Sequence, residues 1–536
     1  MNTSTSGPTP DRSPDTAAVG TEPASRRPNV LFITADQWRG EYLSCAGHPL
    51  ADTPNIDALA AEGVRFARHY SNAAPCGPSR ASLLTGMYAM NHRSVANGTP
   101  LDSRRTNLAL EARRLGYRPW VLGYTDTSVD PRGLSPDDPR LRTYETVMDG
   151  FEAIDRFTEV DTLWTRRLEE EGLEVPDPFW ELFRARPDYP GAENHADTWT
   201  PTVVPAELSQ TSVLTDLAME LIDEEGRSGR PFFLHLSYLA PHPPWRAPEG
   251  YHDLFDAADV PPPKRGASLA DDLALHPVME HFARPRFAAD AADQSWQRQC
   301  TATYLGLIKL VDDNLGRLFG HLRHRGMWED TLVVFTSDHG EQMFDHAMLG
   351  KSLWFESSYH IPLVIRGPRR IRGVGSESPP DAGIGVVKGE FTENVDIMPT
   401  ILELCGAGSI PRQCDGMSLV PLLEGRAPRR WREGAHWEFD FRWHPARRRL
   451  GLGPDEAALA VYRTPDAKYV HFAGLPPVFH DLGVDPHELV NRASDTGAAG
   501  AMLDLASEML SLRMSRAERT LSHMRYTAGG PEYIDP

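Results

Sequence analysis

The chain has 536 residues, which is longer than one hydrophobic core usually supports, so we expect a large domain and at least one smaller one. Its 55 basic and 75 acidic residues leave a formal net charge of −20, which argues against nucleic-acid binding because that function needs a basic face. No run of about 18 apolar residues is present, so we expect no membrane-spanning helix and no membrane partner. A locally positive pocket on such a protein could still bind an anionic substrate.

The cysteines and the N-terminal segment indicate a reducing compartment. The five cysteines are odd in number and follow no short regular spacing, so a disulfide framework is not expected. Residues 1–27 are rich in Ser, Thr, Pro and acidic residues, which predicts a disordered tail without a signal peptide. Arg26 and Arg27 before an apolar run could be taken for a twin-arginine export signal, but that run is too short. We therefore expect a cytoplasmic protein.

Strand and helix signals alternate from Pro28 onward, which is typical of an α/β sheet. The apolar run NVLFITAD predicts a strand that is buried on both faces. Thr53 and Pro54 then predict the start of a helix that ends at Gly63. We further expect strands at 63–70 and 117–124, a helix that starts at Ser79, and an insertion at 127–200 that could shape a substrate pocket.

The second half continues the same alternation and then changes character. We expect helices at 207–225 and 301–326, and strands at 231–240, 331–336 and 361–366. Beyond residue 428 the segments 457–465, 467–472 and 476–482 predict short strands, and residues 501–521 predict a helix. The expected organisation is a tail at 1–27, a catalytic α/β domain at 28–428, and a C-terminal subdomain at 429–536 with a small antiparallel sheet.

Several expected strands end in polar residues, which is where open α/β sheets place ligands. Asp36 and Gln37 follow the first strand, His242 follows the strand at 231–240, and Asp338 and His339 follow the strand at 331–336. Carboxylate and amide oxygens with one imidazole would suit a single divalent cation: Mn²⁺, Ca²⁺ or Mg²⁺, with Zn²⁺ as an alternative. Each residue also has a structural explanation, because an Asp at a strand end commonly caps a turn and a histidine beside prolines commonly serves a loop.

The same ambiguity applies to the stretch PCGPSRASLLTG at 75–86. Taken alone, Cys76 reads as a packed thiol, and Lys351 reads as a solvated charge. However, Cys76, Pro78, Ser79 and Arg80, followed by LTG, resemble the sulfatase signature C-x-P-S-R-x-x-x-L-T-G. The resemblance extends through the segments PNVLFITADQWRG, TPNIDALAAEGVRF, TLVVFTSDHGE and ENVDIMPTILELCG. The chain is therefore identified as a member of the sulfatase branch of the alkaline phosphatase superfamily.

That resemblance implies the fold and the chemistry. The fold is an alkaline-phosphatase-like α/β architecture, with a mostly parallel central sheet flanked by helices. In the family the signature cysteine is oxidised to formylglycine by a formylglycine-generating enzyme, which becomes a partner during maturation. Hydrated formylglycine carries two hydroxyls on one carbon, so one can attack the substrate and the other can later expel the product. The remaining cofactor is one divalent cation, with Mn²⁺ or Ca²⁺ ranked first.

Three departures resemble one subgroup, the phosphonate monoester hydrolases and phosphodiesterases. Gln37 stands where common arylsulfatases have an acid, Tyr124 stands in place of a lysine, and His339 stands in place of an asparagine. By this resemblance the metal ligands would be Asp36, Gln37, Asp338, His339 and the formylglycine from Cys76. Arg80 and Lys351 would orient the nucleophile and the anionic centre, His242 would act as general acid, and Asn97, Tyr124, Thr125 and Asp126 would contact substrate. Asp126 itself departs from the subgroup, which typically has threonine there.

The sequence leaves three functions to compare. Phosphonate monoester and phosphodiester hydrolysis ranks first, because Tyr124 in place of a lysine favours centres that carry an extra organic group. Arylsulfate hydrolysis ranks second, since it too involves a tetrahedral centre with one negative charge. A binding protein that kept the fold and lost the chemistry ranks last, because the motif residues are present. The subgroup resemblance also implies a homodimer or homotetramer, with the tail after Ala501 as a possible interface.

Overall fold

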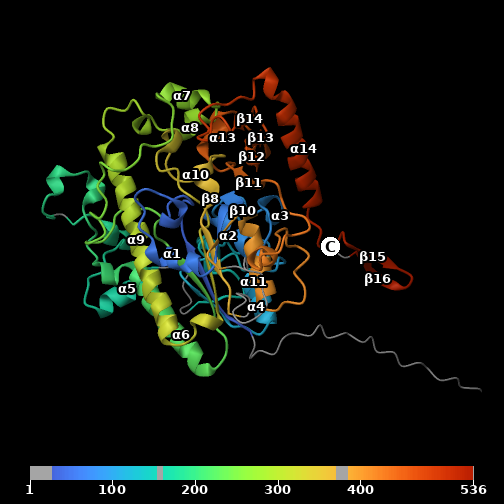
Figure 1. The fold of residues 1–536 in the computed structure, drawn as a ribbon, viewed down its shortest axis with the longest axis horizontal. Coiled ribbons are helices and arrows are strands. Elements are labelled where there is room, and N and C mark those ends of the chain that lie inside the picture. The colour runs from blue at the N-terminus through green and yellow to red at the C-terminus, as the bar shows by residue number, and fades with distance from the viewer. Residues whose placement is uncertain (1–26, 154–160, 187, 370–383, 535–536) are drawn as a thin grey trace, which may run out of the picture.

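The computed structural model describes residues 27–153, 161–186, 188–369 and 384–534. Its centre is a nine-stranded sheet in the order β10-β2-β9-β7-β1-β6-β4-β5, with β8 paired to β2 (Figure 1). Most neighbours in this sheet are parallel, whereas β9 and β8 run antiparallel to their partners. The strands are β1 (Asn29–Ala35), β2 (Val64–Tyr70), β4 (Pro119–Leu122), β5 (Glu152–Ala153), β6 (Phe233–Tyr238), β7 (Thr331–Thr336), β8 (His360–Ile361), β9 (Leu363–Arg366) and β10 (Val386–Glu393).

Helices cover both faces of this sheet, because successive side chains of its strands point to opposite sides. On β1, Leu31 and Ile33 pack into the core that includes α1, α6 and α9, whereas Val30 and Phe32 pack into the core that includes α2, α4 and α11. The helices are α1 (Pro54–Ala61), α2 (Cys76–Thr85), α3 (Ala89–His92), α4 (Leu108–Arg114), α5 (Asp161–Glu170), α6 (Gln210–Ser228), α7 (Leu269–Ala274), α8 (Met279–Phe282), α9 (Ser295–His324), α10 (Glu356–Tyr359), α11 (Ile397–Leu404), α12 (Val420–Leu423), α13 (Pro445–Arg449) and α14 (Ala499–Ser515).

The C-terminal region forms a second, smaller sheet, as expected. Its order is β14-β13-β12-β11-β3, with β11 (Ala435–Asp440), β12 (Ala458–Arg463), β13 (Ala467–Phe472) and β14 (Val478–Asp481) antiparallel. The fifth strand, β3 (Ala73–Ala74), comes from the segment just before Cys76 and pairs in parallel with β11. The fold class predicted from the sequence is therefore confirmed, and the small sheet is attached directly to the segment that carries Cys76.

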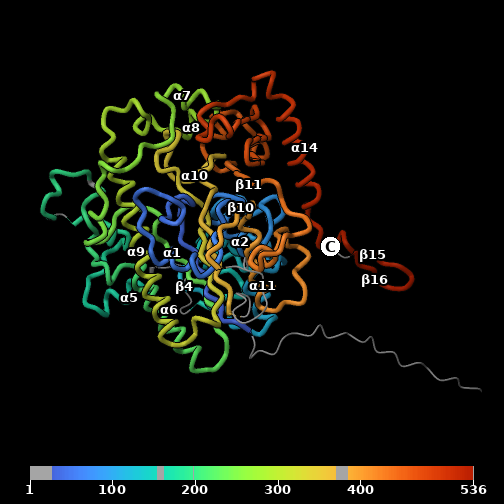
Figure 2. The backbone as a smooth tube through the Cα atoms, viewed as in Figure 1, coloured from blue at the N-terminus to red at the C-terminus, as the bar shows by residue number. Residues whose placement is uncertain are grey.

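Some details differ from the sequence-based expectations. Helix α2 begins at Cys76 rather than at Ser79, so the cysteine lies in the first turn of the helix. The strand β10 was not expected; its first half is partly exposed and contains Lys388 and Gly389, which weakens the apolar pattern. The end of the chain forms a hairpin, β15 (Met524–Thr527) and β16 (Gly530–Tyr533), that projects from the body (Figure 2). Apart from Arg27, the expected tail at 1–27 lies outside the described residues.

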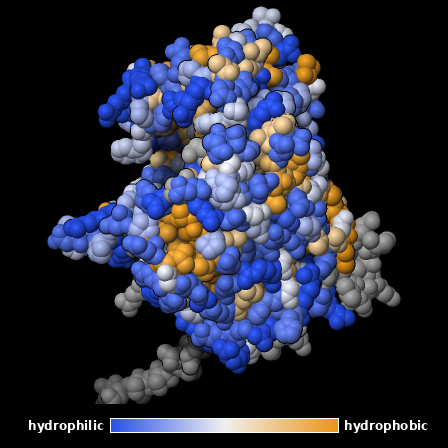
Figure 3. Space-filling model, turned by 90° about the vertical axis from the view of Figure 1, so that its left-hand side faces the viewer, coloured by the Kyte–Doolittle hydropathy of each residue, from blue (hydrophilic) through white to orange (hydrophobic). Residues whose placement is uncertain are grey.

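Surface features bear on the remaining expectations. The face in Figure 3 is mainly hydrophilic, with apolar residues gathered in separate areas. On α14, Leu503, Leu510 and Met514 are exposed, and the oligomer expected from the resemblance stays a prediction.

Among the described helices, none is both long and apolar enough to cross a membrane. All five cysteines lie in the described ranges, and no disulfide joins any two of them.

A buried ion pair joins the segment before β11 to the central sheet. Arg432 donates to both carboxylate oxygens of Asp396, and its Nη2 lies 3.7 Å from Oε2 of Glu393, which ends β10. Both acids are fully buried and Arg432 is nearly so. Removing one partner of a buried pair leaves an uncompensated charge, which costs more than the pair contributes.

We expect Arg432→Met to lower the free energy of unfolding by about 3–5 kcal/mol, because two buried carboxylates lose their cation. Chemical denaturation of the purified variants would measure this change. Arg426→Met is the matched control, because Arg426 pairs with Glu424 on the surface and should contribute at most about 1 kcal/mol. Equal effects of the two substitutions would contradict the structural role of Arg432.

Candidate active site

The predicted site residues converge where neighbouring strands of the central sheet end. Asp36 follows β1, Asp338 and His339 follow β7, and these strands are adjacent. Potential ligand atoms of Asp36, Cys76, Asp338 and His339 all lie within 4.8 Å of one another, and all four residues are buried. Parallel strands bring their carboxyl ends to one edge of the sheet, which explains how residues far apart in the sequence form one cluster.

Cys76 faces this cluster from the first turn of α2. Its Sγ lies 3.2 Å from Nε2 of His339 and 3.9 Å from Oδ1 of Asp36. Burial and the neighbouring Asp36 raise the pKa of the Cys76 thiol well above its usual value. An unmodified thiol would stay protonated at neutral pH, and a protonated thiol is a poor nucleophile. The position suits a reactive group, but the thiol itself is not activated by these residues.

Arg80 lies one turn along the same helix and is completely buried. Its Nε lies 3.0 Å from Oδ2 of Asp338, and its Nη2 lies 3.1 Å from Oδ2 of Asp36. Nη1 donates to Oγ of Ser237 at 2.7 Å and to the carbonyl oxygen of Tyr124 at 3.1 Å. Arg80 therefore holds both acids of the cluster, and its hydrogen-bonding capacity is directed at the protein rather than outward.

Burial raises the pKa of both carboxyl groups, but their neighbours make the net shifts opposite in direction. Burial opposes ionisation of Asp36, but its basic neighbours, His242 first among them, bring its pKa well below the usual value. Burial and the nearby Asp36 raise the pKa of Asp338 to about 6. Two close carboxylates in one buried site cannot both ionise freely unless positive charge is added. Arg80 supplies one positive charge, and a bound cation would supply the rest.

Gln37 is oriented by two residues, one of which the sequence did not indicate. Its amide nitrogen donates to Oε2 of Glu341, and its Oε1 accepts a hydrogen bond from Nζ of Lys351. Glu341 is fully buried, and its Oε1 accepts from the backbone N–H groups of Met343 and Gly350. The amide carbonyl therefore points toward Lys351 and away from Glu341. Glu341 directly follows the segment SDHG, which is the one signal that could have identified it.

The structure places His242 near the cluster with a defined tautomer. Its Nδ1 lies 2.7 Å from the carbonyl oxygen of Pro243, which can only accept, so Nδ1 carries the proton. Burial and the positive charge of Lys351 lower the pKa of His242 to about 4. A neutral ring then presents Nε2 as an acceptor, so action as an acid requires the ring to be protonated when an anion binds.

Of the residues expected to contact substrate, Tyr124 bonds to a member of the cluster, whereas Asn97 and Thr125 bond to nearby backbone groups. Oδ1 of Asn97 accepts from the backbone N–H of Gly77 at 2.9 Å, and the hydroxyl of Tyr124 donates to Oδ2 of Asp36. Thr125 uses its hydroxyl within its own loop, where it donates to the carbonyl oxygen of Thr146 and accepts from the N–H of Met148. These contacts make Asn97 and Thr125 positioning residues in this state.

Asp126 is placed under strain at the edge of the site. Its backbone has a positive φ of 51°, which is uncommon for a residue other than glycine. Its side chain is buried, and Oδ1 has no hydrogen-bond partner in the described structure. Burial and the charge of Asp36 raise the pKa of Asp126 to about 7, against the opposing effect of Arg80. A group that changes charge near neutral pH therefore lies beside the nucleophile position.

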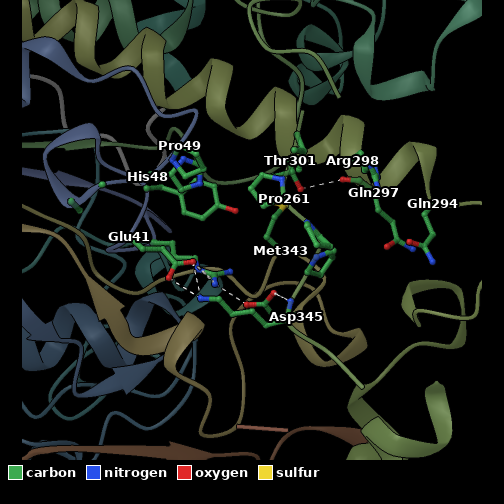
Figure 4. A pocket seen from close by; sticks show the side chains of 18 residues that line it. Glu41, His48, Pro49, Pro261, Gln294, Gln297, Arg298, Thr301, Met343 and Asp345 are labelled. Atoms are coloured by element: carbon green, nitrogen blue, oxygen red, sulfur yellow. Dashed lines mark hydrogen bonds and ion pairs between the residues drawn. The ribbon is translucent and has the colours of Figure 1, made fainter. Parts of the chain in front are cut away.

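Two other hollows are relevant to the choice of site. One pocket, with a volume of about 350 Å³, is drawn in Figure 4. In it Arg39 pairs with Glu41 and Asp345, and Lys264 pairs with Glu41. None of the predicted site residues lines this pocket. A larger hollow of about 590 Å³ includes Pro75, next to the nucleophile position, and Lys351. Of these two hollows, the second is therefore the one that extends beside the nucleophile position.

The cluster fits one divalent cation by its chemistry. Carboxylate oxygens from Asp36 and Asp338, the amide oxygen of Gln37 and one imidazole nitrogen of His339 form a donor set typical of hard or borderline cations. The position-76 side chain completes the set. The close approach of two buried acids is the observation that calls for such a cation.

Comparisons with known proteins agree with this geometry. The family model described as Sulfatase matches residues 28–407, and the model for the N-sulphoglucosamine sulphohydrolase C-terminal region matches 344–515. The multifunctional alkaline phosphatase superfamily protein PehA of Trinickia caryophylli is 41% identical over 524 residues, or 94% of this chain and 98% of the relative. An arylsulfatase of Clostridium perfringens is 28% identical over 87% of this chain and 90% of the relative.

Solved structures give the same picture. The phosphonate monoester hydrolase of Agrobacterium radiobacter superposes with a TM-score of 0.86 at 41% identity, covering 95% of this chain and 100% of that chain. The phosphonate monoester hydrolase of Silicibacter pomeroyi superposes with a TM-score of 0.85 at 37% identity, covering 95% and 99%.

The role of Glu341 can be tested through metal affinity. Glu341→Gln keeps an oxygen for Met343 and Gly350 but replaces the acceptor of the Gln37 amide with an NH₂ group. Because residues that orient a ligand tune metal binding, we expect the affinity for Mn²⁺ to fall about 10- to 100-fold. Competition with a chelating indicator would measure it. The surface substitution Glu171→Gln is the control, and unchanged affinity in Glu341→Gln would remove this role.

Proposed function

Because the chain belongs to the sulfatase family of hydrolases, we propose that it hydrolyses phosphonate monoesters and phosphodiesters, with sulfate esters as secondary substrates. The observation that carries this proposal is the cluster of Asp36, Asp338 and His339 around Cys76. Beside it, Tyr124 donates to Asp36, and Gln37 accepts from Lys351. The similarity to phosphonate monoester hydrolases over nearly the whole chain supports it.

The charged groups of the site favour a substrate whose reacting centre carries one negative charge. Arg80 directs its guanidinium at Asp36 and Asp338, so Lys351 is the cation of the site that is left to meet the substrate. Asp126 adds a carboxyl group beside the nucleophile position, where it opposes a second negative charge on the substrate. Phosphonate monoesters, phosphodiesters and sulfate monoesters carry one charge at the reacting centre, whereas phosphate monoesters carry up to two. Tyr124, as a neutral group, leaves room for an organic substituent.

Two groups complete the chemistry in this proposal. A divalent cation, Mn²⁺ or Ca²⁺ before Mg²⁺ or Zn²⁺, would be held by Asp36, Gln37, Asp338 and His339 and would supply charge neutralisation at the reacting centre. Formylglycine, made from Cys76 by a formylglycine-generating enzyme, would supply a hydroxyl nucleophile where the thiol is unreactive. The setting of Cys76, in the first turn of α2 beside His339, supports this modification.

The protein's own residues have distinct tasks in this mechanism. Lys351 holds the anionic centre and stabilises the charge that develops on it; its own positive charge persists because neighbouring acids keep its pKa above the usual value despite burial. Arg80 fixes Asp36 and Asp338 and limits their movement. His242 receives a proton at Nε2 when the anionic substrate binds, and delivers it to the leaving oxygen.

The ranking of substrates is tested by direct comparison. With one leaving group throughout, we expect kcat/KM for an aryl phenylphosphonate to exceed that for the aryl sulfate by about tenfold or more, and the aryl phosphate monoester to be slowest. Cys76→Ala is the control, because it should abolish hydrolysis of all three and identify one shared nucleophile. Sulfate preferred over phosphonate would make the protein an arylsulfatase, and an unmodified Cys76 in mass spectra of the active enzyme would exclude formylglycine.

The acid role of His242 predicts a dependence on the leaving group. We expect His242→Ala to slow esters of alkyl alcohols by about 10²–10⁴-fold, because alkoxides need a proton to leave, and to slow nitrophenyl esters far less. A plot of log kcat against leaving-group pKa would show the steeper slope. The exposed His324→Ala serves as control. Equal slowing of both ester classes would show that His242 binds substrate without donating a proton.

A further inference from the structure

The hollow that includes Pro75 and Lys351 extends away from the cluster toward the C-terminal sheet. It is also lined by aromatic residues at the end of α8 and after β11, among them Phe282, Phe441 and Trp443. The ring of Phe282 stacks on His444 with centroids 4.3 Å apart, which joins α8 to α13; the two helices lie side by side at the top of Figure 1. A second hollow, of about 560 Å³, shares Trp443 and His444 with it, and we call the two hollows together the distal pocket.

The charged residues that line these two hollows are mainly basic, whereas the whole chain has an excess of acidic residues. The chain carries a formal charge of −20, yet the described residues that line the two hollows include one acid, Asp440, which pairs with Arg442 at 2.8 Å. The basic residues that line them are Arg284, Arg286, Lys351, Arg442, Arg447, Arg448 and Arg449. A positive concentration on an acidic protein attracts anions to that place.

Three of these arginines are free to bind a ligand. Within the described part of the chain, the guanidinium groups of Arg284, Arg448 and Arg449 form no ion pair or hydrogen bond, and all three side chains are exposed. The charges of two of them act on His444: burial lowers its pKa first, and the charges of Arg284 and Arg449 lower it further. Two segments that are far apart in the sequence, one with Arg284 and one with Arg448 and Arg449, therefore bring arginines without ion-pair partners to the distal pocket.

Trp443 gives the pocket a second property. It lines both hollows and is 78% exposed, which is unusual for so large an apolar side chain. Indole and guanidinium groups both stack on flat rings, and guanidinium groups also bind carboxylate or phosphate oxygens. A ligand that combines a planar apolar group with an anionic group matches both sets of side chains.

We propose that the distal pocket binds the organic part of the ester, and that the preferred substrates carry a planar group with a second anionic substituent, such as a carboxylate, away from the reacting centre. This inference rests on the proposed hydrolase function and extends it to a substrate class. Lys351 and Pro75 line the part of the pocket beside the nucleophile position; Arg284 lines the same hollow, Arg449 lines the second, and Trp443 lines both. The two anionic groups of the substrate would then be held by separate cations.

The test uses pairs of esters that differ in charge and little in shape. Each pair carries a 4-carboxy or a 4-carbamoyl group on an aryl ring; in one pair the ring is on phosphorus, and in the other it is the leaving group. We expect the intact enzyme to prefer the carboxylate in one pair by about tenfold in kcat/KM, since each exposed charge pair contributes up to about 1 kcal/mol. The preference should shrink at high salt, because these charges are exposed.

Variants identify the residues responsible. In Arg284→Ala/Arg449→Ala the carboxylate-to-carbamoyl ratio should fall to about one, and Trp443→Ala should weaken binding of aryl relative to methyl phosphonates. Arg230→Ala, at a surface position outside both hollows, is the matched control and should keep the ratio. A ratio near one in the intact enzyme for both pairs, or a ratio that survives the double substitution, would overturn the proposal.

A binding measurement separates this inference from the proposed function. The product 4-carboxyphenylphosphonate should change the fluorescence of the exposed Trp443 at lower concentration than its carbamoyl analogue, with no turnover required. If the enzyme hydrolyses none of the esters and this difference is still seen, the proposed function fails and the distal pocket stands. If the enzyme hydrolyses phenylphosphonate esters and no difference is seen in either assay, the distal pocket fails and the function stands.

Discussion

The fully buried guanidinium of Arg80 is the interaction on which the site depends. It binds Asp338 after β7, Asp36 after β1, Ser237 of β6 and the backbone just after β4. These are four successive strands of the central sheet. One side chain of α2 thus ties the helix that carries Cys76 to the strand ends that carry its partners. The arrangement needs a cation here, because two buried carboxylates facing each other would otherwise repel.

The local charges of the site follow from this constraint. Arg80 is used within the protein, so in the proposed function recognition of a substrate would fall to Lys351 and to groups farther out. Asp126, held at positive φ with an unpaired oxygen, would limit the negative charge that the centre accepts. The distal pocket, in contrast, collects unpaired arginines on a chain with an excess of acidic residues. Under both proposals, the site would tolerate little negative charge on a ligand at the centre and more at a distance.

The C-terminal sheet contributes to this difference between the reacting centre and the distal pocket. It is bound to the segment before Cys76 through β3 and to the central sheet through Arg432, so its position relative to the cluster is fixed by backbone pairing and by buried charge. Its residues after β11 form one wall of the distal pocket, while the segment after α8 forms another. Substrate selection can therefore vary through these segments without altering the cluster itself.

The sequence by itself determined the layered α/β fold, the strands that carry Asp36 and Asp338, the helix after Cys76 and the small C-terminal sheet. Those features depend on apolar periodicity, on residues that start and stop helices, and on one ordered motif, all of which are local. Only the tertiary structure decided that β3 joins the C-terminal sheet, that Glu341 orients Gln37, that Thr125 serves its own loop, and that Arg284 and Arg449 line adjoining hollows. The physical reason is that these contacts join residues far apart in the chain, where no local pattern records which side chains meet.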